Sequence, residues 1–240
     1  MNDIELLNEE AQYEELRKLG QRLHVPVPEV FWELEVRDKS GRVIQRHRQR
    51  SHSWVRNAYN MMFCYLAGKD LSNSGFGAGY LSLKDTGGSV RYGAGGVCVS
   101  QNTSLDGTSM GYRGPAGNDT YGILVGSGIN PESFDDYALQ SKIANGTGAG
   151  QLSYVESEAH AISWIPGTLT MKNELARFFN NNSGNAVNVN EVALALHGYQ
   201  PGSGVPYNFT TARDKLVATV TVPNTGQLKV TYTVQLTYPA

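Results

Sequence analysis

The sequence has little of several features that would assign it quickly to a class. Its two cysteines, Cys64 and Cys98, are too few for a disulfide framework. Charged residues make up only 18% of the chain and the net charge is −2, which argues against nucleic acid as a partner. No apolar run is long enough to cross a membrane, and the first residues are acidic rather than basic and then apolar. We therefore expect no signal peptide, no membrane partner and a reducing compartment.

Glycine and tyrosine are abundant instead, with 27 and 13 residues. This composition is typical of strands joined by turns, and 240 residues suit one large β domain with an appended segment. Most of the glycines lie between residues 75 and 150. We predict an N-terminal helical arm and proline linker over residues 1–28 and a β-sandwich domain over 29–240. Within that domain we expect a hairpin plus helix (29–68), a Gly-rich loop and strand region (69–150) and regular strands (151–240).

Hydrophobic periodicity predicts the elements. Helical spacing indicates helices over 3–23 and 53–66, and a short helix over Asp135–Ile143. Val30 to Val36 alternate as a strand, and the turn Asp38–Gly41 returns the chain as a hairpin over 42–50. Further strand segments are expected at Tyr80–Leu83, Val97–Val99, Tyr121–Val125, Leu152–Trp164, Thr168–Phe179, Ala186–Leu196, Lys215–Val222 and Gln227–Tyr238.

The fold class follows from the last of these segments and its neighbours. Leu228, Val230 and Tyr232 alternate with threonines and other polar residues, as in an antiparallel strand with one buried face. Several such strands at short spacing, without long helices between them, predict a mainly β protein. We expect an antiparallel β-sandwich, jelly-roll-like, with an N-terminal helical arm and one further helix.

Charge is unevenly distributed along the first 60 residues. The first fifteen hold only acidic charges, whereas residues 37–56 are rich in arginine. One interpretation is a solvated helix followed by a solvated strand face. A second is that the acidic arm of one subunit docks on the basic stretch of a neighbour, because opposite charges steer association and fix register. A third is phosphate binding by the arginines. The interaction residues predicted by the second are Glu9, Glu10, Glu14, Glu15, Arg42, Arg46, Arg48 and Arg50.

Motifs for catalysis or cofactor binding are weak. Gly107–Gly111 matches the G-x-S-x-G pattern around Ser109, but turns flank it where a nucleophile elbow needs a strand and a helix. Asp85 and Ser109 echo subtilase segments, yet no histidine lies between them. The five histidines lack metal-ligand spacing, and Gly75–Gly79 lacks a surrounding βαβ unit. We predict no enzyme activity, no metal and no cofactor; a hydrolase is an alternative that would depend on Ser109.

Tyrosines in or beside the Gly/Asn-rich loops offer another route to binding. Such rings can stack on sugars, so a carbohydrate-binding module with a host-surface glycan as partner is the alternative function. Tyrosine also populates sheet faces and interfaces, which is the simpler explanation. The residues concerned are Tyr80, Tyr92, Tyr112, Tyr121, Tyr154, Tyr199 and Tyr207.

Several segments between residues 50 and 238 resemble structural proteins of tailed bacteriophages. They are Tyr121–Gly128, Asp135–Leu139, Gly146–Tyr154, Phe178–Gly184, Val189–Ala193, Ala212–Asp214, Val220–Pro223 and Leu228–Val234. These are turns and strands without a catalytic residue. The resemblance implies a virion component made in the host cytoplasm, with copies of itself and other virion proteins as partners. We expect a homo-oligomeric capsid-associated (decoration) protein; a tail, neck or baseplate protein is the alternative placement.

Overall fold

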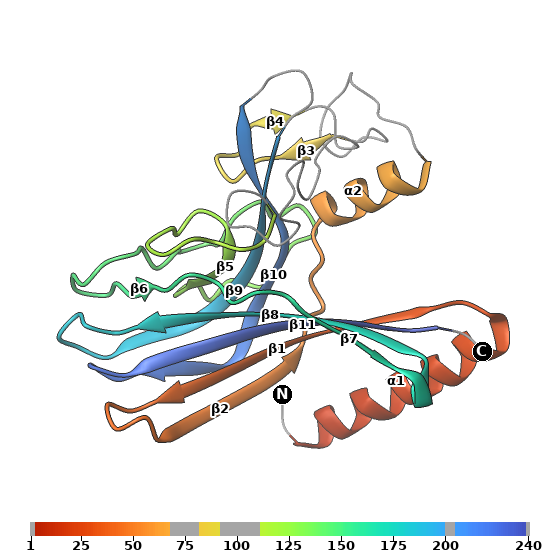
Figure 1. The fold of residues 1–240 in the computed structure, drawn as a ribbon, viewed down its shortest axis with the longest axis horizontal. Helices are drawn as coiled ribbons and strands as arrows, with labels where there is room; N and C mark the ends of the chain where they lie inside the picture. Colours follow the sequence, from red (N-terminus) through yellow and green to blue (C-terminus); the bar gives the residue numbers. More distant parts are fainter. Residues whose placement is uncertain (1–2, 68–81, 92–110, 200–204, 239–240) are drawn as a thin grey trace.

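The computed structural model describes residues 3–67, 82–91, 111–199 and 205–238 (Figure 1). In chain order the elements are α1 (Asp3–Leu23), β1 (Val27–Arg37), β2 (Val43–Arg50), α2 (Arg56–Ala67), β3 (Leu83–Lys84), β4 (Val90–Arg91), β5 (Gly122–Gly126), β6 (Ser153–Tyr154), β7 (Ala161–Ile165), a 3-10 turn (Pro166–Thr168), β8 (Thr170–Asn180), β9 (Val187–Tyr199), β10 (Pro206–Val222) and β11 (Gln227–Thr237). The fold class is therefore confirmed: the protein is mainly β and antiparallel, with an N-terminal helix and one further helix.

Two antiparallel sheets form the sandwich. Sheet A has the order β2-β1-β11-β8-β6, with β7 pairing β8 on the same side as β6, and sheet B has the order β10-β9-β5. The chain crosses between the sheets from β8 to β9 and from β10 to β11, whereas β1–β2, β7–β8 and β9–β10 are hairpins within one sheet. A small β3–β4 ribbon forms a third sheet, and the N–H of Thr86 in its turn donates to the carbonyl of Asn208 on β10 at 2.9 Å (Figure 1).

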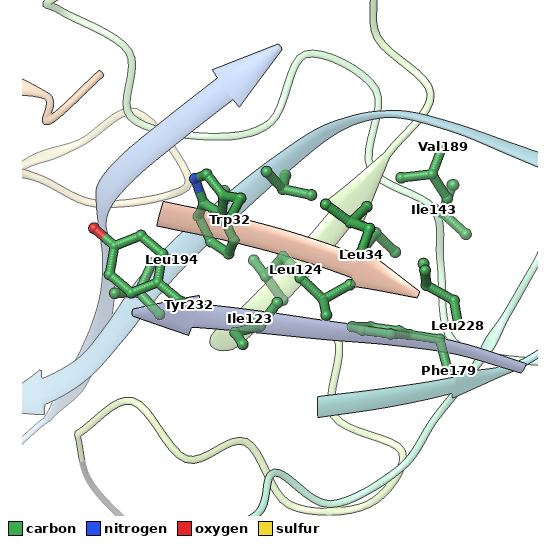
Figure 2. Packing of buried hydrophobic residues seen from close by; sticks show 14 of the residues in the cluster. Trp32, Leu34, Ile123, Leu124, Ile143, Phe179, Val189, Leu194, Leu228 and Tyr232 are labelled. Atoms are coloured by element: carbon green, nitrogen blue, oxygen red, sulfur yellow. The ribbon is translucent and has the colours of Figure 1, made fainter. Parts of the chain in front are cut away.

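The alternation predicted in β11 places its apolar face against sheet B. Leu228, Val230 and Tyr232 are buried, and they share one core cluster with residues of β9 such as Val189 and Leu194. Figure 2 shows side chains from both sheets interleaving in this cluster, from Trp32 at one end to Leu228 at the other. Burial of aliphatic and aromatic surface is the main force that holds the two sheets together.

A buried carboxylate also joins the sheets. Asp214 on β10 accepts hydrogen bonds from the indole N–H of Trp32 at 2.7 Å, the hydroxyl of Ser51 at 2.6 Å and the backbone N–H of His52 at 2.9 Å. Burial raises the pKa of Asp214, and these three donors oppose that rise by stabilising its ionised form. The carboxylate thus fixes the segment that follows β2 against sheet B.

Glutamine side chains close the sandwich along β2. Gln45 and Gln49 each make two hydrogen bonds to the backbone of β10. The amide of Gln45 donates to the carbonyl of Thr219 and accepts from the N–H of Thr221, both at 3.1 Å. Gln49 makes the equivalent pair with Lys215 and Val217 at 3.0 and 3.1 Å. This edge of sheet A is therefore bound to sheet B by side chains.

Three element predictions differ from the structure. The predicted helix Asp135–Ile143 is wrong: this segment is irregular, because its side chains and backbone N–H groups bind distant partners. The predicted strand Leu152–Trp164 is divided into β6 and β7. β10 begins nine residues before the predicted Lys215, because the buried charges of Arg213 and Asp214 interrupt the apolar alternation. The segment Val97–Val99 lies outside the described residues.

Glu191 on β9 organises part of the irregular chain between β5 and β6. It is fully buried and accepts hydrogen bonds from the backbone N–H groups of Gly128, Gln140 and Ser141 at 3.1, 3.0 and 2.7 Å. Arg213 on the neighbouring strand donates to it at 2.9 Å. A buried charge is tolerated when it is paired and hydrogen-bonded, and Glu191 meets both conditions.

Arg177 on β8 organises the chain before β5. Its side chain is fully buried, and its guanidinium donates to five backbone carbonyls at 2.6–3.2 Å. The acceptors are Pro115, Asn118, Tyr121, Ile123 and Val155. Burial lowers the pKa of Arg177 to about 10, so it stays charged at neutral pH. Gly114 lies so close that an added Cβ would be 2.6 Å from Nη1.

The Arg177→Met substitution should leave the five carbonyls that Arg177 binds without these donors. Each unsatisfied buried polar group costs about 1–3 kcal/mol, so we expect the free energy of unfolding to fall by at least about 3 kcal/mol. Arg42→Met removes the same charge from an exposed side chain paired with Asp38, and should cost no more than about 1 kcal/mol. Urea unfolding curves measure both; equal losses would contradict the role of Arg177.

Candidate interaction site

The turn between α1 and β1 fixes the position of the helix. Gly20 is buried, and a Cβ there would lie 2.7 Å from the carbonyl oxygen of Val25 and from Cγ2 of Val27. The N–H of Val25 donates to the carbonyl of Gly20 at 2.9 Å, and His24 adopts a positive φ of 52°. This tight reversal lays α1 alongside sheet A, next to the start of β1 (Figure 1).

Four charged side chains attach α1 to sheet A, and we call them the helix latch: Glu10, Arg17, Glu29 and Arg50. Arg17 binds Glu10 and Glu29, both at 2.8 Å, and Arg50 binds the same two carboxylates, both at 2.5 Å. The charges therefore alternate around a closed ring. Glu29 and Arg50 are 2% and 6% exposed, so the sheet side of the latch is shielded from water.

Aromatic rings enclose the Arg50 guanidinium. Its Cζ lies 3.8 Å from the centroid of the Tyr13 ring and 4.6 Å from that of Phe31, which are cation–π distances. Burial alone would lower the pKa of Arg50, but the hydrogen bonds to Glu29 and Glu10 raise it above its ordinary value. The hydrogen bond from Arg17 lowers the pKa of Glu10, although partial burial opposes this. Arg50 and Glu10 therefore both stay charged at neutral pH.

The structure brings together three of the eight predicted interaction residues. Glu9 and Glu10 lie against Arg50 of the same chain, with Glu9 at 4.0 Å and also in contact with His52. The other five have different surroundings: Glu14 pairs with Lys18 and Glu15 is exposed, while Arg42 pairs with Asp38, Arg46 pairs with Glu35 and Arg48 stacks on Phe31. Docking of the arm on a neighbouring subunit stays a prediction.

Sequence reasoning missed two members of the latch. The helical pattern does not single out Arg17, and Glu29 follows a proline at the start of a strand without a visible partner. Opposite charges twelve residues apart carry no local pairing signal. Only the reversal at Gly20 brings Arg17 and Glu29 together.

Three leucines in the second half of α1 do not face the sheet. Leu16, Leu19 and Leu23 form one stripe and are 44%, 46% and 61% exposed. The residues that face sheet A are instead the polar or small ones, such as Tyr13, Arg17 and Gly20. A helix in a globular protein usually buries its apolar stripe, so this stripe is available for contact with another surface.

Sheet A carries a second exposed apolar surface at β7. All five residues of β7 are exposed, with Ile162 at 70% and Trp164 at 42%. The rings of Trp164 and Tyr238 lie 5.3 Å apart, and Tyr238 is itself half exposed. This end of sheet A extends past β9 and β10, on the side where α1 lies (Figure 1).

An apolar cavity of about 450 Å³ lies between α2 and sheet A. Trp54, Met61 and Met62 line one side and Leu175 and Tyr232 the other. The indole N–H of Trp54 donates to the hydroxyl of Tyr232 at 3.0 Å, so the polar atom of the indole has a partner in the cavity wall. The described lining residues are mostly apolar, with His160, Asn173 and Thr211 as the polar ones, so the cavity suits apolar contact.

The described residues that were considered for catalysis or metal binding make hydrogen bonds, ion pairs or ring contacts within the fold. Asp85 accepts hydrogen bonds within its own turn and pairs with Arg91, and Ser109 lies outside the described residues. His47 contacts Gln49, and His197 stacks on Tyr121. No group of three potential metal ligands gathers in the part of the chain that the structure describes. Neither described helix is long and apolar enough to cross a membrane.

The described loop tyrosines make internal contacts. Tyr154 is buried and donates to the carbonyl of Ile143 at 2.7 Å, Tyr121 stacks on His197, and Arg91 covers Tyr207. Tyr112 is half-buried beside the apolar cavity. Tyr80, Tyr92 and the side chain of Tyr199 lie outside the described residues. Glycan binding stays a prediction.

Comparison with known proteins gives no further constraint. No protein-family model, curated protein or solved structure matches the chain.

Charge reversal on α1 tests the latch. Glu9→Lys with Glu10→Lys places positive charges against Arg17 and Arg50, so we expect α1 to detach and amide exchange within residues 8–23 to rise at least about tenfold. Glu14→Lys with Glu15→Lys makes the same charge change outside the latch and should leave exchange within about twofold. Hydrogen exchange with mass spectrometry measures both; equal acceleration would contradict the latch.

Acid should release α1 before the sandwich opens. Because its pKa is lowered in the folded protein, ionised Glu10 stabilises the docked helix above its ordinary pKa of 4.5, and this stabilisation is lost as the pH falls below that value. We expect protection factors of α1 to fall relative to those of β9 below pH 4.5. Glu10→Gln should reduce this pH dependence, and an unchanged profile in that variant would assign it to another group.

Proposed function

We propose that this chain is a structural subunit of a tailed-phage virion, which assembles with copies of itself and with other virion proteins. Capsid decoration is the first role to test, and a tail, neck or baseplate position is the alternative placement. The observation that carries the proposal is the apolar end of sheet A, where Ile162, Trp164 and Tyr238 are 41–70% exposed. Contiguous apolar surface of this kind marks a protein–protein contact.

The rest of the chain supports a structural role. The sandwich is fixed by buried hydrogen-bonded charges, Arg177, Glu191 and Asp214, as well as by its apolar core. The helix α1, which lies against sheet A, presents a leucine stripe outward. A rigid domain with a segment that contacts neighbours is what a repeated assembly requires. The segments that resemble phage structural proteins form parts of this sandwich and its loops, including β5 and β11.

Light scattering of the purified full-length protein tests self-assembly. We expect a defined oligomer whose mass stays constant above a threshold concentration, because burial of the exposed apolar surfaces favours association. A version starting at Pro28 lacks the leucine stripe and should have a lower mass or a higher threshold. A monomer at all concentrations would contradict self-assembly.

The virion assignment needs a separate measurement. Quantitative mass spectrometry of density-purified phage particles from the source of the gene should find the chain at a fixed copy number per particle. Its recovery only with unassembled host protein would contradict the virion role, whatever its oligomeric state.

A further inference from the structure

The two edges of sheet A differ in how they are protected. β2 forms one edge; it carries three arginines, and Gln45 and Gln49 bind its inner side to β10. On the opposite edge lies β7, which has the sequence Ala161-Ile-Ser-Trp-Ile165 and no charge. Among the described residues β7 pairs only with β8. Natural proteins protect free edges with charges, prolines or covering segments, and β7 has no charge or proline within its length.

An unprotected edge strand offers backbone donors and acceptors to another strand. Addition of a strand there satisfies those groups and buries the alternate side chains in the same step. On β7 four of the five side chains are apolar: Ile162 and Trp164 share one face, and Ala161 and Ile165 share the other with Ser163. Both faces of an added strand would therefore meet apolar neighbours.

We propose that β7 pairs antiparallel with β7 of a second copy about a two-fold axis at Ser163, so that the two A sheets form one continuous sheet. The inference rests on the proposed function, because it specifies how a self-assembling subunit makes its contact. A two-fold contact uses the same strand on both sides, so one exposed edge is sufficient.

The register follows from the length and the sequence of β7. An axis at Ser163 pairs all five residues, whereas an axis at any other residue leaves some unpaired. It places Ile162 opposite Trp164 of the partner subunit, and Ala161 opposite Ile165 of the partner subunit. Cross-strand pairs of an aromatic with a β-branched residue are among the favourable ones in antiparallel sheets.

Charges near the axis do not oppose this contact. Ser163 lies beside Lys172 and Ala161 beside Glu174 on β8. Lys172 and Glu174 pair with each other at 2.8 Å. The neighbouring strand therefore brings no net charge to the axis. This neutrality favours a second copy over a strongly charged partner.

A cysteine at the axis tests the pairing directly. Residues opposite each other in antiparallel strands have Cα atoms about 4.5–5.5 Å apart, which is within the range of a disulfide. Ser163→Cys, in a chain with Cys64→Ser and Cys98→Ser, should give a disulfide-linked dimer on mild oxidation of the assembled protein. Ile44→Cys on the β2 edge is the matched exposed control and should not cross-link.

A second pair of variants measures the contact without a cross-link. Ile162→Lys places a charge in the predicted apolar pair and should raise the dissociation constant of the oligomer at least about tenfold. Ile44→Lys, at the other edge, should change it by less than about threefold. Both residues are exposed, so urea unfolding of the dissociated monomer should be unaffected in either variant.

The outcomes separate this inference from the proposed function. A cross-linked dimer of the Ser163→Cys variant together with weaker association of the Ile162→Lys variant supports both. A stable oligomer that does not cross-link in the Ser163→Cys variant and tolerates Ile162→Lys overturns the β7 contact and leaves self-assembly standing. A wild-type protein that is monomeric at all concentrations overturns both.

Discussion

Buried charged side chains that form hydrogen bonds with the backbone stabilise the irregular part of this structure. The long connection between residues 111 and 152 has few strand residues of its own, and its carbonyl and N–H groups need partners once they leave water. Arg177 supplies N–H donors to carbonyls on one part of the connection, and Glu191 supplies acceptors to N–H groups on another. Each charged side chain thus supplies an irregular segment with the hydrogen-bond partners that a neighbouring strand supplies within a sheet.

These two charges also place β5. Arg177 binds the carbonyls of Tyr121 and Ile123, at the start of the strand, and Glu191 binds the N–H of Gly128, just beyond its end. β5 is only five residues long and lies at the edge of sheet B. Its ends are therefore fixed from two different sheets. The sandwich depends on this arrangement because Ile123 and Val125 belong to its core.

Hydrophobic periodicity and turn residues predicted the elements that depend on residues close together in the chain. The alternation in β11, the helix ending near Leu23 and the turn at Asp38–Gly41 each depend on residues close in the chain, and each is present. The irregular segment around Asp135 could not be predicted in this way. Its carboxylates bind Arg56 and Arg213, which are 79 and 77 residues away.

The candidate site was predictable to the same extent. Blocks of opposite charge led us to predict that the helix docks on β2 of a neighbouring subunit, which stays a prediction. The contact of Arg50 with Glu10 within one chain was not predicted, and the choice of Arg17 and Glu29 as the other partners depends on the reversal at Gly20. The sequence pattern includes β7 within a longer strand. Its exposure was not predictable, because isoleucine and tryptophan are typical of buried strands.

α1 turns charged residues, rather than its leucine stripe, toward sheet A. Its attachment therefore responds to ionic strength. The latch pairs of Glu10, whose side chain is 58% exposed, weaken as the Debye length shortens to about 8 Å at physiological salt and to less above it, whereas the buried pair of Arg50 with Glu29 is screened less. The leucine stripe responds in the opposite direction, because strongly hydrated salts strengthen apolar association. A rising concentration of such a salt therefore weakens the pairs of Glu10 while it strengthens the attraction of the stripe for another apolar surface.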